Sequence, residues 1–171
     1  MSLSLYDITV PPLVSSLGSL KVVVDKGAAH VEAKELDPRA LLDARLYPDM
    51  FPFLRQIQVV SDVSRRGLDR LAGKEPSSTP DDETSFAELG ARITATIEHI
   101  KGADRAAIDA AEDREIKIDL GQPMTFTGRR YVQTFMMPNI MFHLTTAYNI
   151  LRHNGVELGK RDYLTPFVAG A

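Results

Sequence analysis

The sequence predicts an all-α fold: a four-helix bundle with a small β-hairpin inserted before the last helix. Over four long stretches, apolar residues recur at steps of three and four, the pattern of helices with one buried face. Between the third and fourth stretches, within residues 115–127, apolar and polar residues alternate as they do in strands. Four amphipathic helices with short connections favour a bundle, because each helix must bury its apolar face.

The first predicted helix runs from Pro12 to near Gly27. The prolines at its start, Pro11 and Pro12, are tolerated in or before a first turn, where a missing N–H costs little. After it, Asp37 is a helix-capping residue followed by a proline, which predicts one short helix through Asp43.

The second long helix is expected to start between Pro48 and Pro52 and to stop at Gly73. Its core-facing stripe consists of Phe53, Ile57, Val60, Ser64, Leu68 and Leu71. The third long helix opens with a capping box at residues 85–88 and ends at Gly102.

The predicted hairpin pairs residues 115–120 with 124–127 around a Gly-Gln-Pro turn. The fourth long helix follows over residues 129–154, with Gly155 as its cap, and the charged tail at residues 157–162 is expected to be solvated. This last helix is apolar on more than one face, so it is either central or shared with a second subunit. We therefore expect a homodimer.

Composition sets further limits. A chain of 171 residues with 44% hydrophobic residues is expected to form one domain, residues 1–171. A net charge of -3 lacks the basic surplus of nucleic-acid-binding proteins, and the absence of cysteine excludes thiol nucleophiles, thiolate metal sites and disulfides. No apolar run approaches the roughly 18 residues of a membrane span, so a cytoplasmic protein without a membrane partner is expected.

Polar residues interrupt the apolar pattern of the fourth helix, and burying them unpaired costs a few kcal/mol. Asn139 and His143 lie one helical turn apart. Their polar groups therefore either supply hydrogen-bond partners in each other's surroundings or face a pocket. Pro138 either kinks the helix and opens room for a ligand or starts a new helix. Gln56 is the inward polar candidate on the second long helix, and Tyr148 has a polar tip that could line a pocket.

These residues also have ordinary structural explanations. His143 can be a core histidine satisfied by a neighbouring helix, and Gln56 a half-exposed amide. Glu88 and Arg92 are spaced as a surface ion pair on the third long helix, and Asp62 is expected to face solvent.

Two motifs resemble a known family. They are residues 45–53, RLYPDMFPF, followed by Gln56 and Gln58, and residues 142–162, FHLTTAYNILRHNGVELGKRD. They resemble the bacterial domain-of-unknown-function family numbered nineteen ninety-three, a branch of the DinB/YfiT-like superfamily, over nearly the whole chain. The resemblance implies a DinB-like four-helix bundle, often dimeric, with a pocket between helices. In metal-binding relatives that pocket holds a divalent ion through three histidines, one on the second helix and two spaced four apart on the fourth, and several relatives transfer or isomerise thiol-containing small molecules.

This sequence departs from the three-histidine pattern. Four residues after His143 stands Ala147, and four residues before it stands Asn139. The second long helix has no histidine, and its inward polar residue is Gln56. One imidazole and two neutral amides are poor zinc ligands. We therefore predict no metal and no cofactor.

The favoured function is a small-molecule-binding, dimeric bundle in which Gln56, Asn139 and His143 are polar contacts in an apolar cavity. One alternative is a DinB-like thiol-transfer or isomerase-type enzyme that uses His143 as a lone acid or base. Another is a purely structural or interaction protein with a fully packed interior. No phosphate loop, His-Glu-x-x-His motif, nucleophile elbow or dinucleotide fingerprint occurs, so the sequence assigns no reaction.

Overall fold

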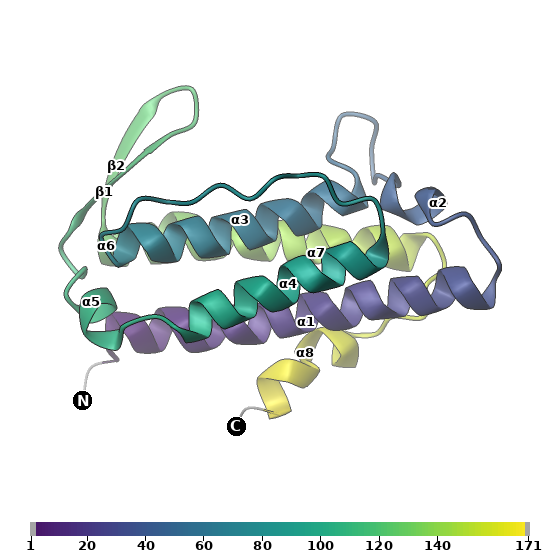
Figure 1. The fold of residues 1–171 in the computed structure, drawn as a ribbon, viewed down its shortest axis with the longest axis horizontal. Helices are drawn as coiled ribbons and strands as arrows, with labels where there is room; N and C mark the ends of the chain where they lie inside the picture. The colour runs from purple at the N-terminus through teal and green to yellow at the C-terminus, as the bar shows by residue number, and fades with distance from the viewer. Residues whose placement is uncertain (1–2, 170–171) are drawn as a thin grey trace.

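Four long helices form a bundle in the computed structural model, which describes the backbone of residues 3–169 and the side chains of residues 3–164. The helices are α1 (Leu5–Ala33), α3 (Phe53–Leu71), α4 (Phe86–Lys101) and α7 (Met137–His153), as Figure 1 shows. Each packs against two others, in the order α1, α4, α3, α7 and back to α1. The predicted four-helix bundle is confirmed.

The predicted hairpin is also present, between α4 and the last long helix. Strands β1 (Glu115–Asp119) and β2 (Pro123–Thr127) pair antiparallel and extend away from the bundle beyond α3 (Figure 1). Gly121, in the turn, has a φ of 89°, a conformation that favours glycine. Ile116 and Ile118 are buried, so one face of the hairpin packs on the bundle.

Five short helical segments complete the fold of residues 3–169. They are α2 (Arg39–Leu42), α5 (Arg105–Asp109), α6 (Gly128–Tyr131), the π-helical η1 (Val132–Met136) and α8 (Lys160–Ala169). The predicted short helix corresponds to α2, where Asp37 accepts a hydrogen bond from the Arg39 N–H at 2.9 Å. Helices α5 and α8 were not predicted.

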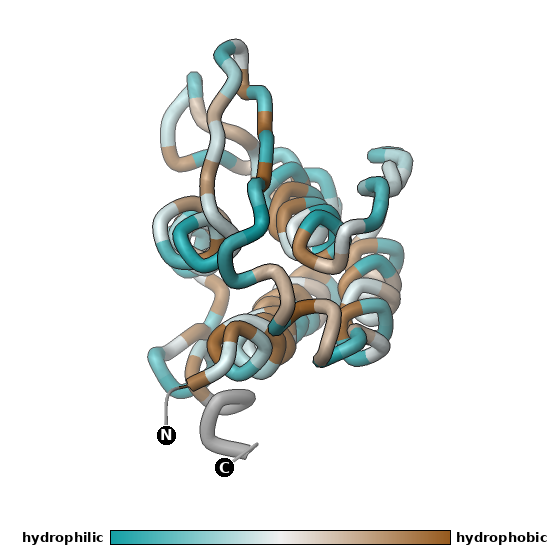
Figure 2. The backbone as a smooth tube through the Cα atoms, turned by 90° about the vertical axis from the view of Figure 1, so that its left-hand side faces the viewer, coloured by the Kyte–Doolittle hydropathy of each residue, from teal (hydrophilic) through white to brown (hydrophobic). Residues whose placement is uncertain are grey.

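The core follows the stripe predicted for the second long helix. All six stripe residues of α3 are buried against the neighbouring helices. Coloured by hydropathy, the backbone of the bundle helices shows hydrophobic and hydrophilic residues mixed along each helix, as expected of amphipathic helices (Figure 2). Burial of apolar side chains is the dominant favourable term in folding, at about 25 cal/mol per Å² of apolar surface.

Helix α1 is longer than predicted at both ends. It begins at Leu5, where the Ser4 hydroxyl caps it by accepting from the Asp7 N–H at 3.2 Å. It continues past Gly27 to Ala33, because this glycine serves close packing and not a helix end. A Cβ at Gly27 would lie 2.8 Å from Leu151 Cδ1 and equally close to the Phe86 ring.

By length and composition alone, α1 is apolar enough to cross a membrane, and half of its most apolar window is buried inside the bundle. The buried side includes Leu13, Leu17 and Leu20, which have no exposed surface. A core helix of a soluble protein passes the same test, and α1 contacts α4, α7 and α8 along its length.

The fourth long helix is continuous from α6 through η1 to α7, close to its predicted limits. In η1 the Met137 N–H donates to the Val132 carbonyl, five residues back, which makes one wider turn. Pro138 follows directly, in the first turn of α7. The proline therefore neither interrupts the helix nor starts a separate one, because the wider turn accommodates it.

The prediction of a surface ion pair between Glu88 and Arg92 is wrong. The Glu88 carboxylate instead accepts from the Thr84 N–H at 2.7 Å, which completes the cap of α4. The Arg92 side chain is 4% exposed and pairs with Asp62 at 2.6 Å, Glu83 at 2.7 Å and Asp81 at 3.0 Å. Asp62, expected to face solvent, is accordingly half-buried.

The end of the charged tail forms the first turn of helix α8, which packs against α1 (Figure 1). The Asp162 carboxylate accepts from the Gly159 N–H at 2.8 Å and pairs with Lys26 of α1 at 2.8 Å. These contacts lower the pKa of Asp162, chiefly through its bond with Lys26. The expectation of a solvated tail is thus wrong in part: Lys160 and Arg161 are exposed, whereas Asp162 is half-buried.

Candidate functional site

Two of the predicted site residues form a direct pair between helices. Nδ1 of His143, on α7, lies 2.6 Å from Oε1 of Gln56, on α3. The other end of the Gln56 amide, Nε2, donates to the Phe51 carbonyl at 2.9 Å. Gln56 is 1% exposed, and both ends of its amide have a hydrogen-bond partner. It is therefore a buried residue and not the half-exposed one expected.

This geometry fixes the protonation of His143. A carbonyl oxygen only accepts, so the Phe51 carbonyl requires the NH₂ end of Gln56. The amide oxygen of Gln56 then faces the imidazole and accepts from Nδ1–H, so in the neutral ring the lone pair is on Nε2. Burial lowers the pKa of His143, and the positive charge of Arg55 lowers it further. Both effects favour the neutral form of His143.

Aromatic rings enclose this imidazole on two sides. The Phe51 ring stacks on it with centroids 6.4 Å apart, and the Phe142 ring meets it edge-on at 5.1 Å. Both phenylalanines remain half or more exposed.

Beside this pair, a pocket of about 320 Å³ opens between α3, the hairpin and the start of the fourth helix; we call it the hairpin pocket. Its apolar lining consists of Val59, Val63, Ile118, Leu120, Tyr131 and Phe135. The rings of Tyr131 and Phe135 stack with centroids 5.6 Å apart. Neighbouring Phe126 of β2 packs on Phe135 at 5.9 Å.

The π-helical turn positions the wall of the hairpin pocket. Tyr131, Phe135 and Asn139, spaced four apart, all line it. A step of four residues overshoots a full turn of an α-helix by about 40°, so such residues normally drift around the axis. The wider turn at η1 reduces this drift and keeps the three on one face.

The polar lining of the pocket comes mainly from α3. It consists of Arg55, Asp62, Arg66, Arg70, Asp119 and Asn139. Of the predicted site residues, Asn139 thus reaches the pocket, whereas Gln56 and His143 pair beside it. Burial raises the pKa of the Tyr131 hydroxyl at the pocket wall, while the charges of Arg70 and Arg66 oppose that rise.

Tyr148 lies apart from the other predicted site residues. Its hydroxyl donates to the Leu158 carbonyl at 3.5 Å, and its ring meets that of Tyr163 edge-on at 6.1 Å. It therefore packs the side of α7 that faces α8.

The arginines of the hairpin pocket were not singled out from the sequence, although a signal exists. Arg55, Val59, Asp62, Arg66 and Arg70 follow one another at steps of three and four along α3. This second stripe lies on the side of α3 opposite the buried stripe that begins at Phe53. In the sequence, a helix face that mixes valine with arginines is typical of a solvent-exposed surface. Its role as a pocket wall becomes evident only in the folded structure, where the hairpin lies over it.

The donor set does not fit the divalent ion of the metal-binding relatives. Nδ1 of His143 is held by Gln56, whose amide is used at both ends, and buried Ala147 offers no donor. Within residues 3–164, no three side chains of histidine, aspartate or glutamate gather to hold a metal ion.

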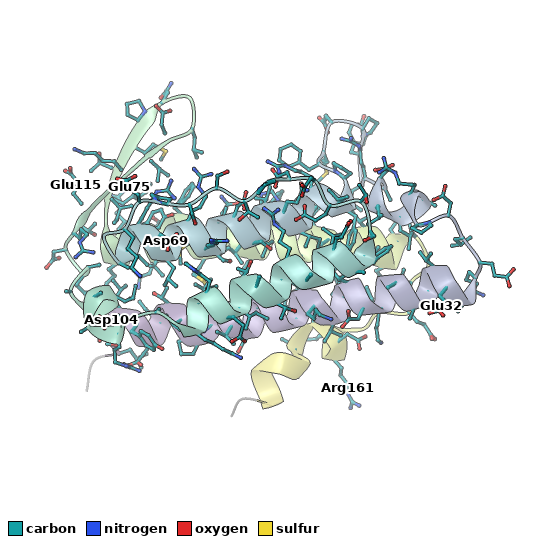
Figure 3. All side chains as sticks on the ribbon, in the orientation of Figure 1. Glu32, Asp69, Glu75, Asp104, Glu115 and Arg161 are labelled. Carbon is teal, nitrogen blue, oxygen red and sulfur yellow. The ribbon has the colours of Figure 1, made fainter. Side chains whose placement is uncertain are left out.

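A second hollow lies near the junction of α4 and α5, where His99 Nε2 lies 2.8 Å from the buried carboxylate of Asp69. Asp69 and Asp104, both in its lining, lie at the hairpin end of the molecule, and Glu32 lies at the opposite end (Figure 3). The His99 and Asp69 pair joins α4 to α3.

Comparison with known proteins agrees with this architecture. Residues 5–164 match the family described as Domain of unknown function (DUF1993). The crystal structure of a DinB family member protein from Shewanella denitrificans, at 1.83 Å resolution, is similar with a TM-score of 0.87 and 39% sequence identity. The match covers 94% of this chain and 91% of that one. No curated protein matches the sequence.

Proposed function

We propose, from the premise that this chain belongs to the DUF1993 family, that it is a small-molecule-binding bundle whose ligand occupies the hairpin pocket. One observation carries the proposal: the pocket holds about 320 Å³ between three structural elements. Ligand sites are concave, largely apolar and supplied with a few polar groups, and about 300 Å³ is the lower end of their volumes. Asn139 is a polar contact within this pocket, and the pair of Gln56 and His143 supports its wall from one side.

The test uses a neutral apolar fluorophore, N-phenyl-1-naphthylamine, and a variant with a filled pocket. Val63→Trp places an indole in the pocket, and Val22→Trp adds one to a half-buried position of α1 outside it. We expect saturable binding of one fluorophore by the wild type and by Val22→Trp, and loss of binding in Val63→Trp.

Thermal unfolding establishes that both variants are folded, and Val59→Trp replaces Val63→Trp if the latter is not. Equal binding by the wild type and a folded, filled variant would overturn the proposal.

A second candidate, an enzyme of the DinB-like thiol-transfer or isomerase kind, is favoured by one observation: Nδ1 of His143 is hydrogen-bonded to Gln56, so a neutral imidazole would have Nε2 as its base. Diethyl pyrocarbonate reacts with neutral imidazoles that solvent can reach. If His143 acts as a base, peptide mass spectrometry is expected to show modification at least as fast as that of exposed His153. Absence of modification at His143 would remove this candidate.

The proposed assembly is a homodimer in the cytoplasm. Its support is an exposed apolar patch of Phe51 and Phe142, which lie on either side of His143 with exposed fractions of 50% and 57%. Large exposed apolar side chains close together are typical of interaction surfaces. Helix α8 covers another part of the apolar surface of α7, where the Tyr163 hydroxyl lies 3.6 Å from Met141 Sδ.

A further inference from the structure

We propose that the ligand of the hairpin pocket is an organic anion: a carboxylate, sulfonate or phosphate group carried on an apolar, ring-containing body. This inference rests on the proposed function and names the chemical class of the ligand. It is drawn from the charges of the pocket and from which of them have partners.

Two of the three arginines at the pocket have no acidic partner within residues 3–164. Arg55 is committed, because it pairs with Asp81 and lies over the Phe51 ring at 5.9 Å. Arg66 and Arg70, one turn apart on the same face of α3, form no ion pair with an aspartate or glutamate in this part of the chain. Arg70 instead contacts the Tyr131 hydroxyl through a side-chain hydrogen bond, and the charges of both arginines act on that hydroxyl.

The two acidic residues of the pocket do not neutralise them. The carboxylate of Asp62 is bound to Arg92 at 2.6 Å. The carboxylate of Asp119 accepts from the Gly121 N–H at 2.8 Å and so stabilises the hairpin turn. Two guanidinium groups therefore remain for an anion, and guanidinium groups match carboxylates, sulfonates and phosphates with paired hydrogen bonds.

The rest of the lining requires an apolar body on that anion. Valines of α3, the rings of Tyr131 and Phe135, and Leu120 of the hairpin turn surround the arginines. Inorganic phosphate would leave these walls in water, whereas a ring bound between them removes apolar surface from water, which is favourable. The amide of Asn139 adds a neutral polar contact at the α7 side.

Two fluorophores with nearly the same body separate the charge from the pocket. 1-Anilinonaphthalene-8-sulfonate carries a sulfonate, and N-phenyl-1-naphthylamine does not. The variants are the double substitution Arg66→Gln with Arg70→Gln, and Arg152→Gln as the control, an exposed arginine of α7 outside the pocket. Titrations are followed by fluorescence at low and moderate salt.

We expect the wild type to bind the sulfonate about tenfold or more tightly than the neutral probe, since each charge-assisted hydrogen bond is worth about tenfold in affinity. The double variant is expected to lose this preference while it still binds the neutral probe, and Arg152→Gln is expected to behave as the wild type. Added salt is expected to weaken only the sulfonate.

The inference fails, and the proposed function stands, if the double variant retains full affinity for the sulfonate while Val63→Trp abolishes binding of both probes. Equal or weaker binding of the sulfonate by the wild type also overturns it. If a folded Val63→Trp binds both probes normally, the ligand site is elsewhere and the proposed function fails with the inference.

Discussion

Nδ1 of His143 lies 2.6 Å from Oε1 of Gln56, a partly buried hydrogen bond that joins α7 to α3. The two residues are 87 positions apart in the chain, and each is polar within an otherwise apolar helix face. The bond fixes both the orientation of the amide and the tautomer of the imidazole. It also determines which helix turns face each other, because sliding α7 past α3 would leave both groups unpaired.

Replacing Gln56 tests this bond directly. Gln56→Leu removes the acceptor of Nδ1–H and the donor to the Phe51 carbonyl, so we expect the free energy of unfolding to fall by about 1–3 kcal/mol. Chemical denaturation measures this value. Exposed Gln133 is the control, and Gln133→Leu should change stability by no more than about 0.5 kcal/mol. Equal effects of the two substitutions would contradict the pair.

The conservative change Gln56→Glu is expected to shift the protonation of His143. A carboxylate at the position of the amide oxygen favours the imidazolium, so the pKa of His143 should rise well above that of the wild type. NMR titration of the imidazole protons measures both values. In the wild type, burial and Arg55 are expected to hold the pKa of His143 below the 6.5 of a free histidine. A wild-type value above 6.5 would refute the neutral assignment.

The same lowered pKa predicts how stability depends on pH. Between the folded and unfolded pKa values of His143, the unfolded chain binds a proton that the folded chain does not. Stability should therefore be fully present above about pH 6.5, fall as the pH drops below that value, and level off below the folded pKa. His143→Gln should remove this part of the profile. A wild-type profile identical to that of His143→Gln would show that His143 contributes nothing to it.

The bundle was predictable because each long helix has its own periodic stripe. The ends of the helices were less predictable, because they depend on packing against residues far away in the sequence. Gly27 resembles a helix terminator in the sequence, yet it is a contact point for Leu151 and Phe86, which lie on other helices. Helix α8 went unpredicted because the residue that anchors it, Asp162, finds its partner on α1 at Lys26.

The candidate site was predictable only residue by residue. Gln56, Asn139 and His143 stood out as polar residues on apolar faces, but the sequence could not say that Gln56 and His143 satisfy each other. Arg66 and Arg70 were not singled out, because their pocket exists only once the hairpin is placed over α3. Tertiary placement, and not local pattern, determines these roles.

Gly27 and Gly90 both lie within long helices, so alanine substitutions at the two positions can be compared directly. An added methyl at Gly27 meets Leu151 and Phe86 at 2.8 Å, so Gly27→Ala should destabilise the protein by about 1–3 kcal/mol. At Gly90 the nearest atom, Lys21 Cε, lies 3.6 Å away in ordinary contact. Gly90→Ala should therefore stabilise the protein by about 0.5–1 kcal/mol through its helix propensity. Thermal unfolding of both variants gives the signs, and the same sign for both would contradict the packing of Gly27.

Arg92 holds the connection between α3 and α4 through Asp62, Asp81 and Glu83. Since its side chain is 4% exposed, Arg92→Leu leaves three carboxylates close together without their shared cation. We expect a loss of about 3–5 kcal/mol in the free energy of unfolding. Exposed Arg152→Leu is the control, with an expected change of at most about 0.5 kcal/mol. A similarly small change in Arg92→Leu would show that the cluster does not stabilise the fold.

The proposed dimer predicts that one exposed apolar side chain matters more than another for assembly. Phe142, 57% exposed, belongs to the apolar patch beside His143, whereas Leu3, 68% exposed, precedes the start of α1. The loop between α2 and α3 lies near the other end of α1 (Figure 1). Sedimentation velocity is expected to show a dimer for the wild type and for Leu3→Ser, and a monomer for Phe142→Ser, because a hydroxyl in place of the ring removes apolar contact area. Circular dichroism checks that Phe142→Ser keeps its helices, which is expected because the ring is mostly in solvent. A wild type that sediments as a monomer at micromolar concentration would exclude the dimer, and a Phe142→Ser variant that stays dimeric would move the interface away from this patch.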